Sequence, residues 1–227
     1  SDHSPETPCL VVDLDTIAEA YDLLTRYLSA ASVYYAVKAN PAREIVGMLA
    51  ARGSNFDVAS PAEIGLCLGN GATPDRLSYG NTIKKERDIA FAFAKGVRLF
   101  AFDSEAELAK LARQAPGARV FCRILVSCEG ADWPLSRKFG CAPEMAVGLL
   151  HRARDLGLDP YGVSFHVGSQ QTDLSQWDHA VGAVARMFTL LAQTDINLRM
   201  VNIGGGFPAR YRGEVAGIER YAQAGTH

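Results

Sequence analysis

The regular alternation of short apolar runs with helical patterns is the strongest constraint on the fold. Seven runs have the composition of strands, at residues 33–37, 55–59, 76–79, 97–102, 119–126, 162–167 and 199–203. Most of these runs are continuously apolar, which is typical of strands that helices cover on both faces or that close into a barrel. Strands that alternate with helices in this order predict a parallel sheet with crossover helices.

Start and stop signals mark several of the helices between these strands. Ser60 and Glu63 form a capping box with a proline at the first helical position, and Ser104 and Glu107 form a second one. A glycine stop and a following proline, at residues 157–160, end a later helix. These signals support repeated βα units.

Repeated βα units predict an α/β fold of the (β/α)8 type, a TIM-like barrel, with an open doubly wound sheet as the alternative. About seven units are present, and a helix is expected at residues 213–225 in place of an eighth strand. Because a barrel with seven strands leaves an open seam, we expect an incomplete barrel in a fragment of a longer protein.

The N-terminal part is expected to lead into the barrel. Residues 9–13 are predicted to form a strand, with a separate sheet as one place for it, and residues 15–31 are predicted to form a helix capped by Asp15. The predicted organisation is therefore an N-terminal strand and helix at 1–32 and the barrel at 33–227.

Composition excludes several classes of function. The net charge is −2 with acids and bases interspersed, so no nucleic-acid or membrane surface is expected. No apolar run is long enough to span a membrane, and the polar start does not have the pattern of a signal peptide. The five cysteines have no metal-binding spacing, which favours buried thiols in a reducing cytoplasm and no metal site.

Polar residues gather where the predicted strands end, which is the edge that carries the active site in such barrels. Lys38 closes the first strand, Asp57 lies in the second, Arg123 lies in the fifth and His166 lies in the sixth. The bodies of the strands are apolar, so we expect the chemistry at this rim.

Three consecutive glycines, Gly204, Gly205 and Gly206, follow the seventh strand. Glycines let backbone N–H groups approach phosphate oxygens, and this place in a barrel is a common phosphate site. A tight turn or a helix cap is the alternative, and the position in the fold favours phosphate.

A lysine at the mouth of the first strand, opposite a phosphate site, suits an imine with pyridoxal phosphate (PLP). Partial removal of water from Lys38 would favour the neutral amine that attacks an aldehyde. There are two alternatives for Lys38. Its side chain can reach solvent, or it can bind phosphate without covalent chemistry.

The other rim residues also have structural alternatives. His166 is either a hydrogen-bonded core histidine or a ring that stacks on the cofactor. Arg123 requires an anionic partner such as Asp57 or Glu63, which can be purely structural. Asp57 either orients Lys38 or the cofactor, or belongs to an ion pair.

Six motifs carry a resemblance to a known family. "YYAVKANP", "NFDVASPAEI", "FAFDSEAEL", "SRKFG", "VSFHVGSQ" and "NIGGGFP" occur in the order of the PLP-dependent ornithine decarboxylase family, which belongs to the alanine-racemase-like fold group. The chain resembles the N-terminal barrel of these enzymes from about residue 8 to residue 207.

The resemblance implies a role for each matching residue. Lys38 would form the covalent link to PLP and His166 would stack on its ring. Ser169 and the three glycines would hold the phosphate, and Asp57, Glu63 and Arg123 would support the lysine and the ring. The implied reaction is decarboxylation of a basic amino acid, L-ornithine to putrescine in polyamine synthesis, by a cytoplasmic homodimer with a shared active site.

Alternatives within and outside the family stay open. Lysine or diaminopimelate decarboxylases share several motifs, and antizyme-inhibitor-like regulators keep the fold without catalysis. A small PLP-carrier protein is a weaker alternative, and alanine racemases fit worse.

The chain also departs from the family pattern. It lacks the Glu-Pro-Gly-Arg motif that supplies the partner of the pyridine nitrogen, and the interface cysteine with its acidic residue. This stretch alone is therefore expected to be inactive. Asn202 occupies a position where many relatives are expected to have Asp.

Overall fold

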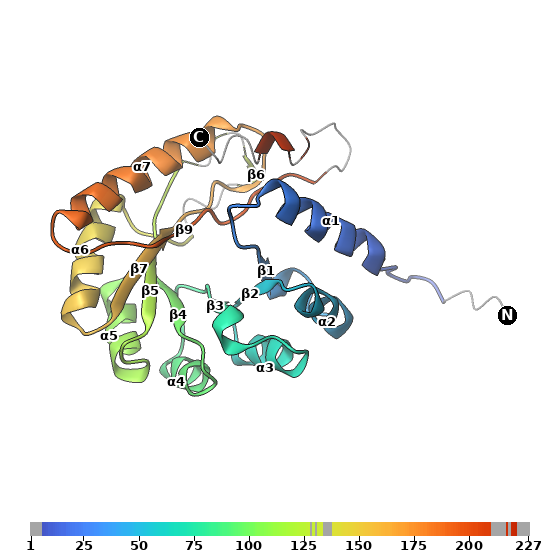
Figure 1. The fold of residues 1–227 in the computed structure, drawn as a ribbon, viewed down its shortest axis with the longest axis horizontal. Coiled ribbons are helices and arrows are strands. Elements are labelled where there is room, and N and C mark those ends of the chain that lie inside the picture. Colours follow the sequence, from blue (N-terminus) through green and yellow to red (C-terminus); the bar gives the residue numbers. More distant parts are fainter. Residues whose placement is uncertain are drawn as a thin grey trace.

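The strands line the centre of the molecule and the helices pack outside them (Figure 1). The structure is a computed structural model that describes residues 6–127, 129, 131–133, 138–209, 217 and 219–221. The helix expected at 213–225 falls largely outside these residues.

The helices in chain order are α1 (Leu14–Tyr27), α2 (Arg43–Ala51), α3 (Pro61–Gly69), α4 (Glu86–Ala94), α5 (Glu105–Gln114), α6 (Pro143–Asp155) and α7 (Ser175–Ala192). Two 3₁₀ turns are η1 (Val37–Ala39) and η2 (Pro74–Arg76). The strands are β1 (Tyr34–Ala36), β2 (Asn55–Val58), β3 (Leu77–Tyr79), β4 (Leu99–Phe102), β5 (Arg119–Arg123), β6 (Ala131–Trp133), β7 (Asp159–Ser164), β8 (Ser169–Gln171) and β9 (Met200–Asn202).

Seven strands form one sheet in the order β1-β2-β3-β4-β5-β7-β9, and every pairing in it is parallel. A doubly wound sheet reverses its strand order at a switch point, whereas this order follows the chain from one edge to the other. The predicted incomplete (β/α)8 barrel is therefore confirmed and the doubly wound alternative is excluded.

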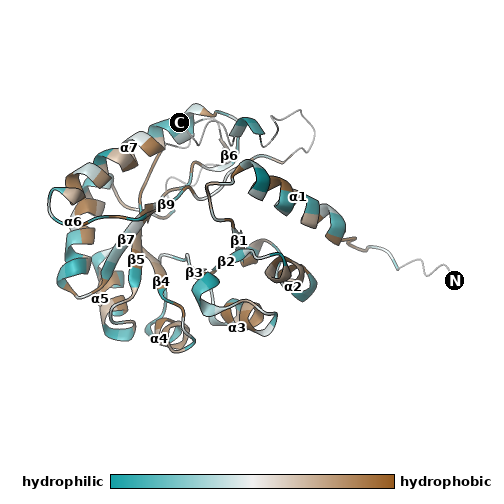
Figure 2. Ribbon diagram, viewed as in Figure 1, coloured by the Kyte–Doolittle hydropathy of each residue, from teal (hydrophilic) through white to brown (hydrophobic). Residues whose placement is uncertain are grey.

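Side chains from the two faces of the sheet enter two separate apolar clusters. Phe100, Phe102 and Cys122 belong to the large core between the sheet and the helices, whereas Leu99 and Phe121 belong to a small cluster on the other face. Because successive strand residues point to opposite faces, Arg123 lies on the same face as Phe121. The helices show both hydrophobic and hydrophilic stretches, as expected of helices that bury one side (Figure 2).

The N-terminal prediction is wrong in two details. Residues 9–13 form no strand, and Leu10 and Val11 are 86% and 80% exposed, because no strand among the described residues pairs with their backbone. The cap of α1 is Asp13 rather than Asp15, since the Asp13 carboxylate accepts hydrogen bonds from the backbone N–H groups of Asp15 and Thr16.

Both predicted serine caps are present, and their glutamates serve different purposes. Ser60 accepts a hydrogen bond from the backbone N–H of Glu63, and Ser104 accepts one from that of Glu107. The Glu63 carboxylate reaches back to the N–H of Ala59, at 2.7 Å. Glu107 instead forms a buried ion pair with Lys84, with 3.0 Å between Nζ and Oε1.

A two-stranded antiparallel sheet, β6–β8, was not predicted from the sequence. Its strands are only three residues long, and β8 follows β7 after a short connection. β7 ends at Ser164, so His166 follows the strand rather than lying in it.

Candidate active site

Strand register brings the predicted site residues to the carboxyl edge of the sheet. Ala36, two residues before Lys38, pairs with Asp57. Ser164, two residues before His166, pairs with Arg123 on one side and with Asn202 on the other. Since strands of a barrel tilt, residues displaced along neighbouring strands reach the same rim.

Lys38 lies in the short turn η1, directly after β1, and its charge acts on both Asp57 and His166. The expectation of a partly desolvated lysine is not met, because Lys38 is exposed at the open mouth of the sheet. The turn places the amine above the strand end instead of within the core. Its proximity to the two titratable groups is the feature that matters for chemistry.

Asp57 is the carboxylate of the site with a raised pKa. Its Oδ1 is buried and has no hydrogen-bond partner among the described residues. Burial raises the pKa of Asp57 to about 6, the positive charges of Lys38 and Arg123 oppose that rise, and the negative charge of Glu63 adds to it. The carboxylate is ionised at neutral pH, with an oxygen free to accept a hydrogen bond.

Arg123 contributes a positive charge to the same cluster and contacts an aromatic ring. Its guanidinium lies over the ring of Phe139, 5.5 Å from the ring centre. Phe139 belongs to the quoted "SRKFG" motif, and no role was predicted for it from the sequence. Arg123 was expected to require an anionic partner. Its charge acts on the Asp57 carboxylate, and its guanidinium also contacts the Phe139 ring.

His166 is held as a neutral ring. Its Nδ1 accepts a hydrogen bond from the backbone N–H of Gly168, at 3.0 Å, so Nδ1 carries no proton. Burial and, to a smaller extent, the positive charges of Arg123 and Lys38 together lower the pKa of His166 to about 4. Gly168 has a φ of 98° and was not predicted as a site residue, although it lies within the quoted "VSFHVGSQ" motif.

The glycine turn lies directly against the segment that carries His166. A Cβ on Gly204 would meet the Phe165 carbonyl oxygen at 2.3 Å, and one on Gly206 would meet the Gly168 carbonyl oxygen at 2.3 Å. Gly204 has a φ of 75°. Only residues without a side chain permit both this backbone conformation and this close approach.

The three backbone amides of the turn are not equally available to a ligand. The N–H of Gly204 donates to the Asn202 side-chain oxygen at 2.8 Å, and that of Gly205 donates to the Ile203 carbonyl. Asn202 therefore shapes the turn as a hydrogen-bond acceptor. Within the described structure the N–H of Gly206 has no such partner, and the carbonyl of Gly206 binds the N–H of Gln171 in β8.

Ser169 opens β8, which the Gly206 carbonyl ties to the turn. At the end of the turn, the ring of Phe207 stacks on Trp177 of α7, with 5.7 Å between ring centres. These contacts fix the glycine segment between β8 and α7. The predicted phosphate residues thus lie on neighbouring segments at the rim.

The residues present fit pyridoxal phosphate on three counts. Asp57 offers a buried oxygen with no partner among the described residues, an added Cβ on Gly205 would meet nothing within 4 Å, and Lys38 is near both Asp57 and His166. An aldehyde, an aromatic ring and a phosphate are the groups that these features accommodate. No metal-binding group of His, Cys, Asp or Glu occurs in the part of the chain that the structure describes.

Comparison with known proteins decides the family. Residues 14–225 match the model of the pyridoxal-dependent decarboxylase family, pyridoxal binding domain. The chain belongs to this family. Its cofactor is pyridoxal phosphate, as predicted from Lys38 and the glycine turn.

Related sequences agree with this assignment. The chain is 40% identical over 202 residues to a lysine/ornithine decarboxylase of Selenomonas ruminantium, covering 89% of this chain and 51% of the relative. It is 39% identical to mouse (Mus musculus) ornithine decarboxylase, with 87% and 43% covered. Antizyme inhibitor 2 of Xenopus laevis is 35% identical, also with 87% and 43% covered.

Solved structures of this family share the fold. A variant of the Selenomonas ruminantium lysine decarboxylase in complex with PLP has a TM-score of 0.92 and 38% identity, and the match covers 96% of this chain and 57% of that one. The chain thus spans about half the length of the relatives that it matches.

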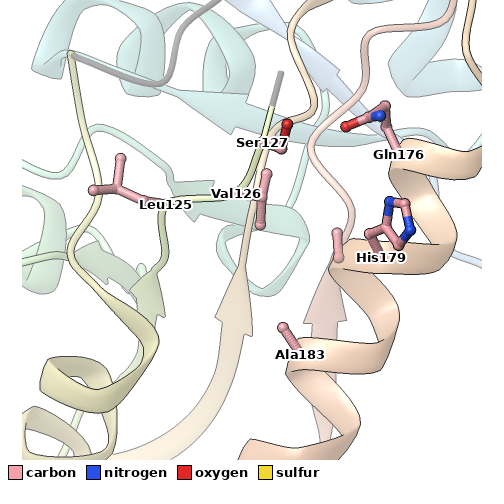
Figure 3. Close-up of a pocket in the computed structure, with 7 residues that line it drawn as sticks. Leu125, Val126, Ser127, Gln176, His179 and Ala183 are labelled. Carbon is pink, nitrogen blue, oxygen red and sulfur yellow. The ribbon is translucent and has the colours of Figure 1, made fainter. Parts of the chain in front are cut away.

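The structure also has a pocket of about 140 Å³ (Figure 3). It lies between the segment that follows β5 and helix α7, and its walls are formed by Leu125, Val126, Ser127, Gln176, His179, Ala180 and Ala183. None of the predicted site residues lines it. No described helix has the length and apolar character needed to span a membrane.

Proposed function

We propose that the chain forms the cofactor-binding part of a PLP-dependent decarboxylase of basic amino acids, with L-ornithine as the first candidate substrate and putrescine as the product. The observation that carries the proposal is the charged cluster at the rim, in which Lys38 and Arg123 act on both Asp57 and His166. The glycine turn packed against His166 completes it.

Bound pyridoxal phosphate supplies an aldehyde that takes up the substrate amino group and an aromatic ring that accepts the electron pair left when CO2 departs. Lys38 would hold the cofactor through its side-chain amine. Asp57, ionised above its pKa of about 6, attracts the Lys38 ammonium and keeps it at the rim.

His166 contributes a flat, uncharged ring. With its Nδ1 accepting from Gly168 and its pKa lowered to about 4, the imidazole stays neutral at working pH and presents an apolar face for stacking. The Gly206 N–H and the Ser169 hydroxyl are the groups proposed to hold the phosphate. Glu63, through its bond to Ala59, fixes the backbone beside Asp57.

The choice of amino acid is proposed from the relatives. A lysine/ornithine decarboxylase and ornithine decarboxylases are among the similar proteins, so lysine is the nearest alternative substrate, followed by diaminopimelate. The similarity to an antizyme inhibitor favours a second candidate, a regulator without catalysis. The presence of Lys38, His166 and the glycine turn supports the enzyme.

We further propose that the protein acts as a homodimer with a shared active site in the cytoplasm. The four cysteines that the structure describes are free thiols, which suits a reducing compartment. Analytical ultracentrifugation of the purified protein tests the dimer, because a single monomeric species at micromolar concentration would contradict it.

Cofactor attachment and CO2 release test the function separately. The purified protein is mixed with PLP, its near-violet absorbance is recorded, and borohydride is added before peptide mass analysis. We expect the cofactor to be reduced onto Lys38. Lys38→Ala should lose the absorbance, whereas Lys85→Ala, at an exposed lysine outside the cluster, should keep it.

Release of CO2 is then measured from L-ornithine, L-lysine and diaminopimelate with the full-length protein. Release from L-ornithine at the highest kcat/KM supports the proposed substrate. Attachment of PLP to Lys38 without CO2 release from any of the three amino acids would contradict the proposed decarboxylase activity. The same result would still support the proposed cofactor site. Absence of attachment would favour the regulator.

A further inference from the structure

Two cysteines far apart in the sequence meet in the core. Cys122 lies in β5 and Cys141 lies just before α6, and their Sγ atoms are 3.6 Å apart. The backbones are held together as well, since the N–H of Cys141 donates to the Arg123 carbonyl and the N–H of Leu125 donates to the Cys141 carbonyl. The pair is therefore fixed by sheet-like hydrogen bonds rather than by chance contact.

The pair lies on the opposite face of β5 from the proposed cofactor site. Cys122 and Cys141 belong to the core between sheet and helices, whereas Arg123 points to the other face. Nothing in the proposed function uses these two thiols.

The two thiols differ in exposure and in acidity. Cys141 is 6% exposed and Cys122 is fully buried. Burial raises the pKa of Cys122, while a hydrogen bond from the Cys122 thiol lowers the pKa of Cys141. The more accessible sulfur is thus the one that more readily becomes a thiolate, and its neighbour retains the proton. A thiol whose pKa is lowered by an adjacent second thiol is the arrangement found in oxidation-sensitive pairs.

We propose that Cys122 and Cys141 are a modification site at which a peroxide oxidises the two thiols to an intramolecular disulfide. A small oxidant suits a sulfur that is only slightly exposed. A disulfide needs an S–S distance of about 2.05 Å, so the sulfurs must approach by roughly 1.5 Å, within reach of side-chain rotation and small backbone shifts.

The oxidation proceeds in two steps. The Cys141 thiolate attacks one oxygen of hydrogen peroxide, an S–O bond forms, the O–O bond breaks, and the departing hydroxide becomes water. The Cys122 thiol then loses its proton and attacks the Cys141 sulfur, so the S–S bond forms and a second hydroxide leaves as water. Two thiols lose two electrons, and one peroxide is reduced to two waters.

The bridge would close a loop that reaches the rim. The loop from 122 to 141 contains Arg123 and Phe139, whose cation–π contact is part of the site. Its far end is held by the Asp103 carboxylate, which accepts a hydrogen bond from the N–H of Gly140 at 2.9 Å. Because these contacts already hold the two segments together, the disulfide is compatible with the fold.

Peptide mass analysis tests the proposal on the wild-type protein, so no variant has to fold. The purified protein is treated with hydrogen peroxide, the remaining thiols are alkylated in denaturant, and trypsin is added without reductant. We expect one linked species of residues 120–123 and 139–152, lighter than the two free peptides together by two hydrogens, about 2 Da. Dithiothreitol should restore both free peptides.

Cys67 is the matched control, because it is a buried thiol in α3 with no cysteine recorded beside it among the described residues. At peroxide concentrations that link Cys122 to Cys141, the Cys67 thiol should stay reduced and should therefore be alkylated in the next step. Cys122→Ala and Cys141→Ala should each abolish the linked species. The proposal is overturned if no link forms, if Cys141 is oxidised to sulfinic acid instead, or if it pairs with Cys128, which lies outside the described residues.

Discussion

At the scale of single residues, Asp57 and His166 are two rim residues whose pKa values depart from their ordinary values. The folded-state pKa of Asp57 lies above its ordinary value and that of His166 lies below. Between pH 3.8 and about 6 the folded Asp57 binds more protons than the unfolded one, so its share of stability falls as pH rises. Between pH 6.5 and about 4 the folded His166 binds fewer, so its share falls as pH drops.

These two effects oppose each other over nearly the same pH range, and substitution separates them. Asp57→Asn removes the buried charge, so at pH 7.5 we expect a rise in the free energy of unfolding of up to about 3 kcal/mol, from about two pKa units at 1.36 kcal/mol each. At pH 4.5 the gain should shrink, because the folded wild-type Asp57 is then mostly protonated. Urea denaturation at the two pH values measures both.

The exposed Asp155→Asn serves as the control for the loss of a surface charge. It should change stability by less than about 1 kcal/mol at either pH. A less stable Asp57→Asn variant at pH 7.5 would contradict the assignment of Asp57 as a destabilising buried charge.

Arg123 couples the two titrating groups, since its charge lowers the pKa of both. In Arg123→Met the pKa values of Asp57 and His166 should therefore both rise. A pH titration of the imidazole C–H signals by NMR measures the value for His166. Arg119→Met, at the other end of β5, should leave that titration unchanged, and an unmoved pKa in Arg123→Met would refute the coupling.

At the scale of elements, a buried ammonium group joins the carboxyl ends of β3 and β4. Lys84 donates to the Asn81 carbonyl after β3 and to the Ala101 carbonyl in β4, at 2.8 and 2.6 Å, while it pairs with Glu107 of α5. Burial lowers the pKa of Lys84 to about 8 against the opposing effect of Glu107. Removal of one member leaves the other charge buried, which is costly.

Lys84→Met should reduce the free energy of unfolding by about 3 kcal/mol or more, because among the described residues Glu107 then keeps only the ion pair with Lys110. The double variant Lys84→Met/Glu107→Leu should recover most of that loss. Urea denaturation measures both. A double variant no more stable than Lys84→Met would show that the charge left behind is not the cause.

The surface pair Arg113–Glu86 provides the comparison, since its side chains are 56% and 42% exposed. Arg113→Met should cost less than about 1 kcal/mol in the same experiment.

The glycine turn is the second element on which the site depends. Gly204→Ala adds a Cβ that meets the Phe165 carbonyl, so the turn must move away from His166. We expect the affinity for PLP to fall by about tenfold or more, equivalent to about 1.4 kcal/mol. Equilibrium titration followed by absorbance measures it.

Gly53→Ala separates backbone strain from close contact. Gly53 also has a positive φ, 86°, but nothing lies within 4 Å of an added Cβ. This variant should lose stability without losing affinity for PLP. Equal affinity losses in the two variants would rule out the contact with Phe165 as the cause.

At the scale of the whole molecule, the seven-stranded sheet has two ends within the described residues, β1 and β9. Lys38 follows the first of these strands and the three glycines follow the last. A cofactor held by both would connect the two ends of the open sheet. The proposed site therefore depends on the curvature of the whole sheet.

Hydrogen exchange tests this connection. Addition of PLP should slow amide exchange in β1 and β9, since both strands gain a shared ligand. Exchange in α4, which lies between β3 and β4 in the chain, should stay unchanged. Lys38→Ala should remove the protection at β1. Slower exchange confined to β9 would contradict a ligand that joins both edges.

Local patterns predicted much of this. The seven parallel strands, the Ser60 and Ser104 caps and the identity of the cofactor all follow from short sequence segments. Two of the failures have a common cause, since a strand at 9–13 and the two-stranded sheet β6–β8 depend on whether a distant segment offers a pairing partner. Sequence periodicity carries no record of that partner.

The sequence by itself determined the order of the βα units and the residues that reach the rim, because periodicity, capping and glycine are properties of neighbouring residues. Only the tertiary structure decided the pKa values of Asp57 and His166, the Lys84–Glu107 pair and the meeting of Cys122 with Cys141. Burial and charge interactions are set by which distant side chains share a small volume, and folding alone brings them together.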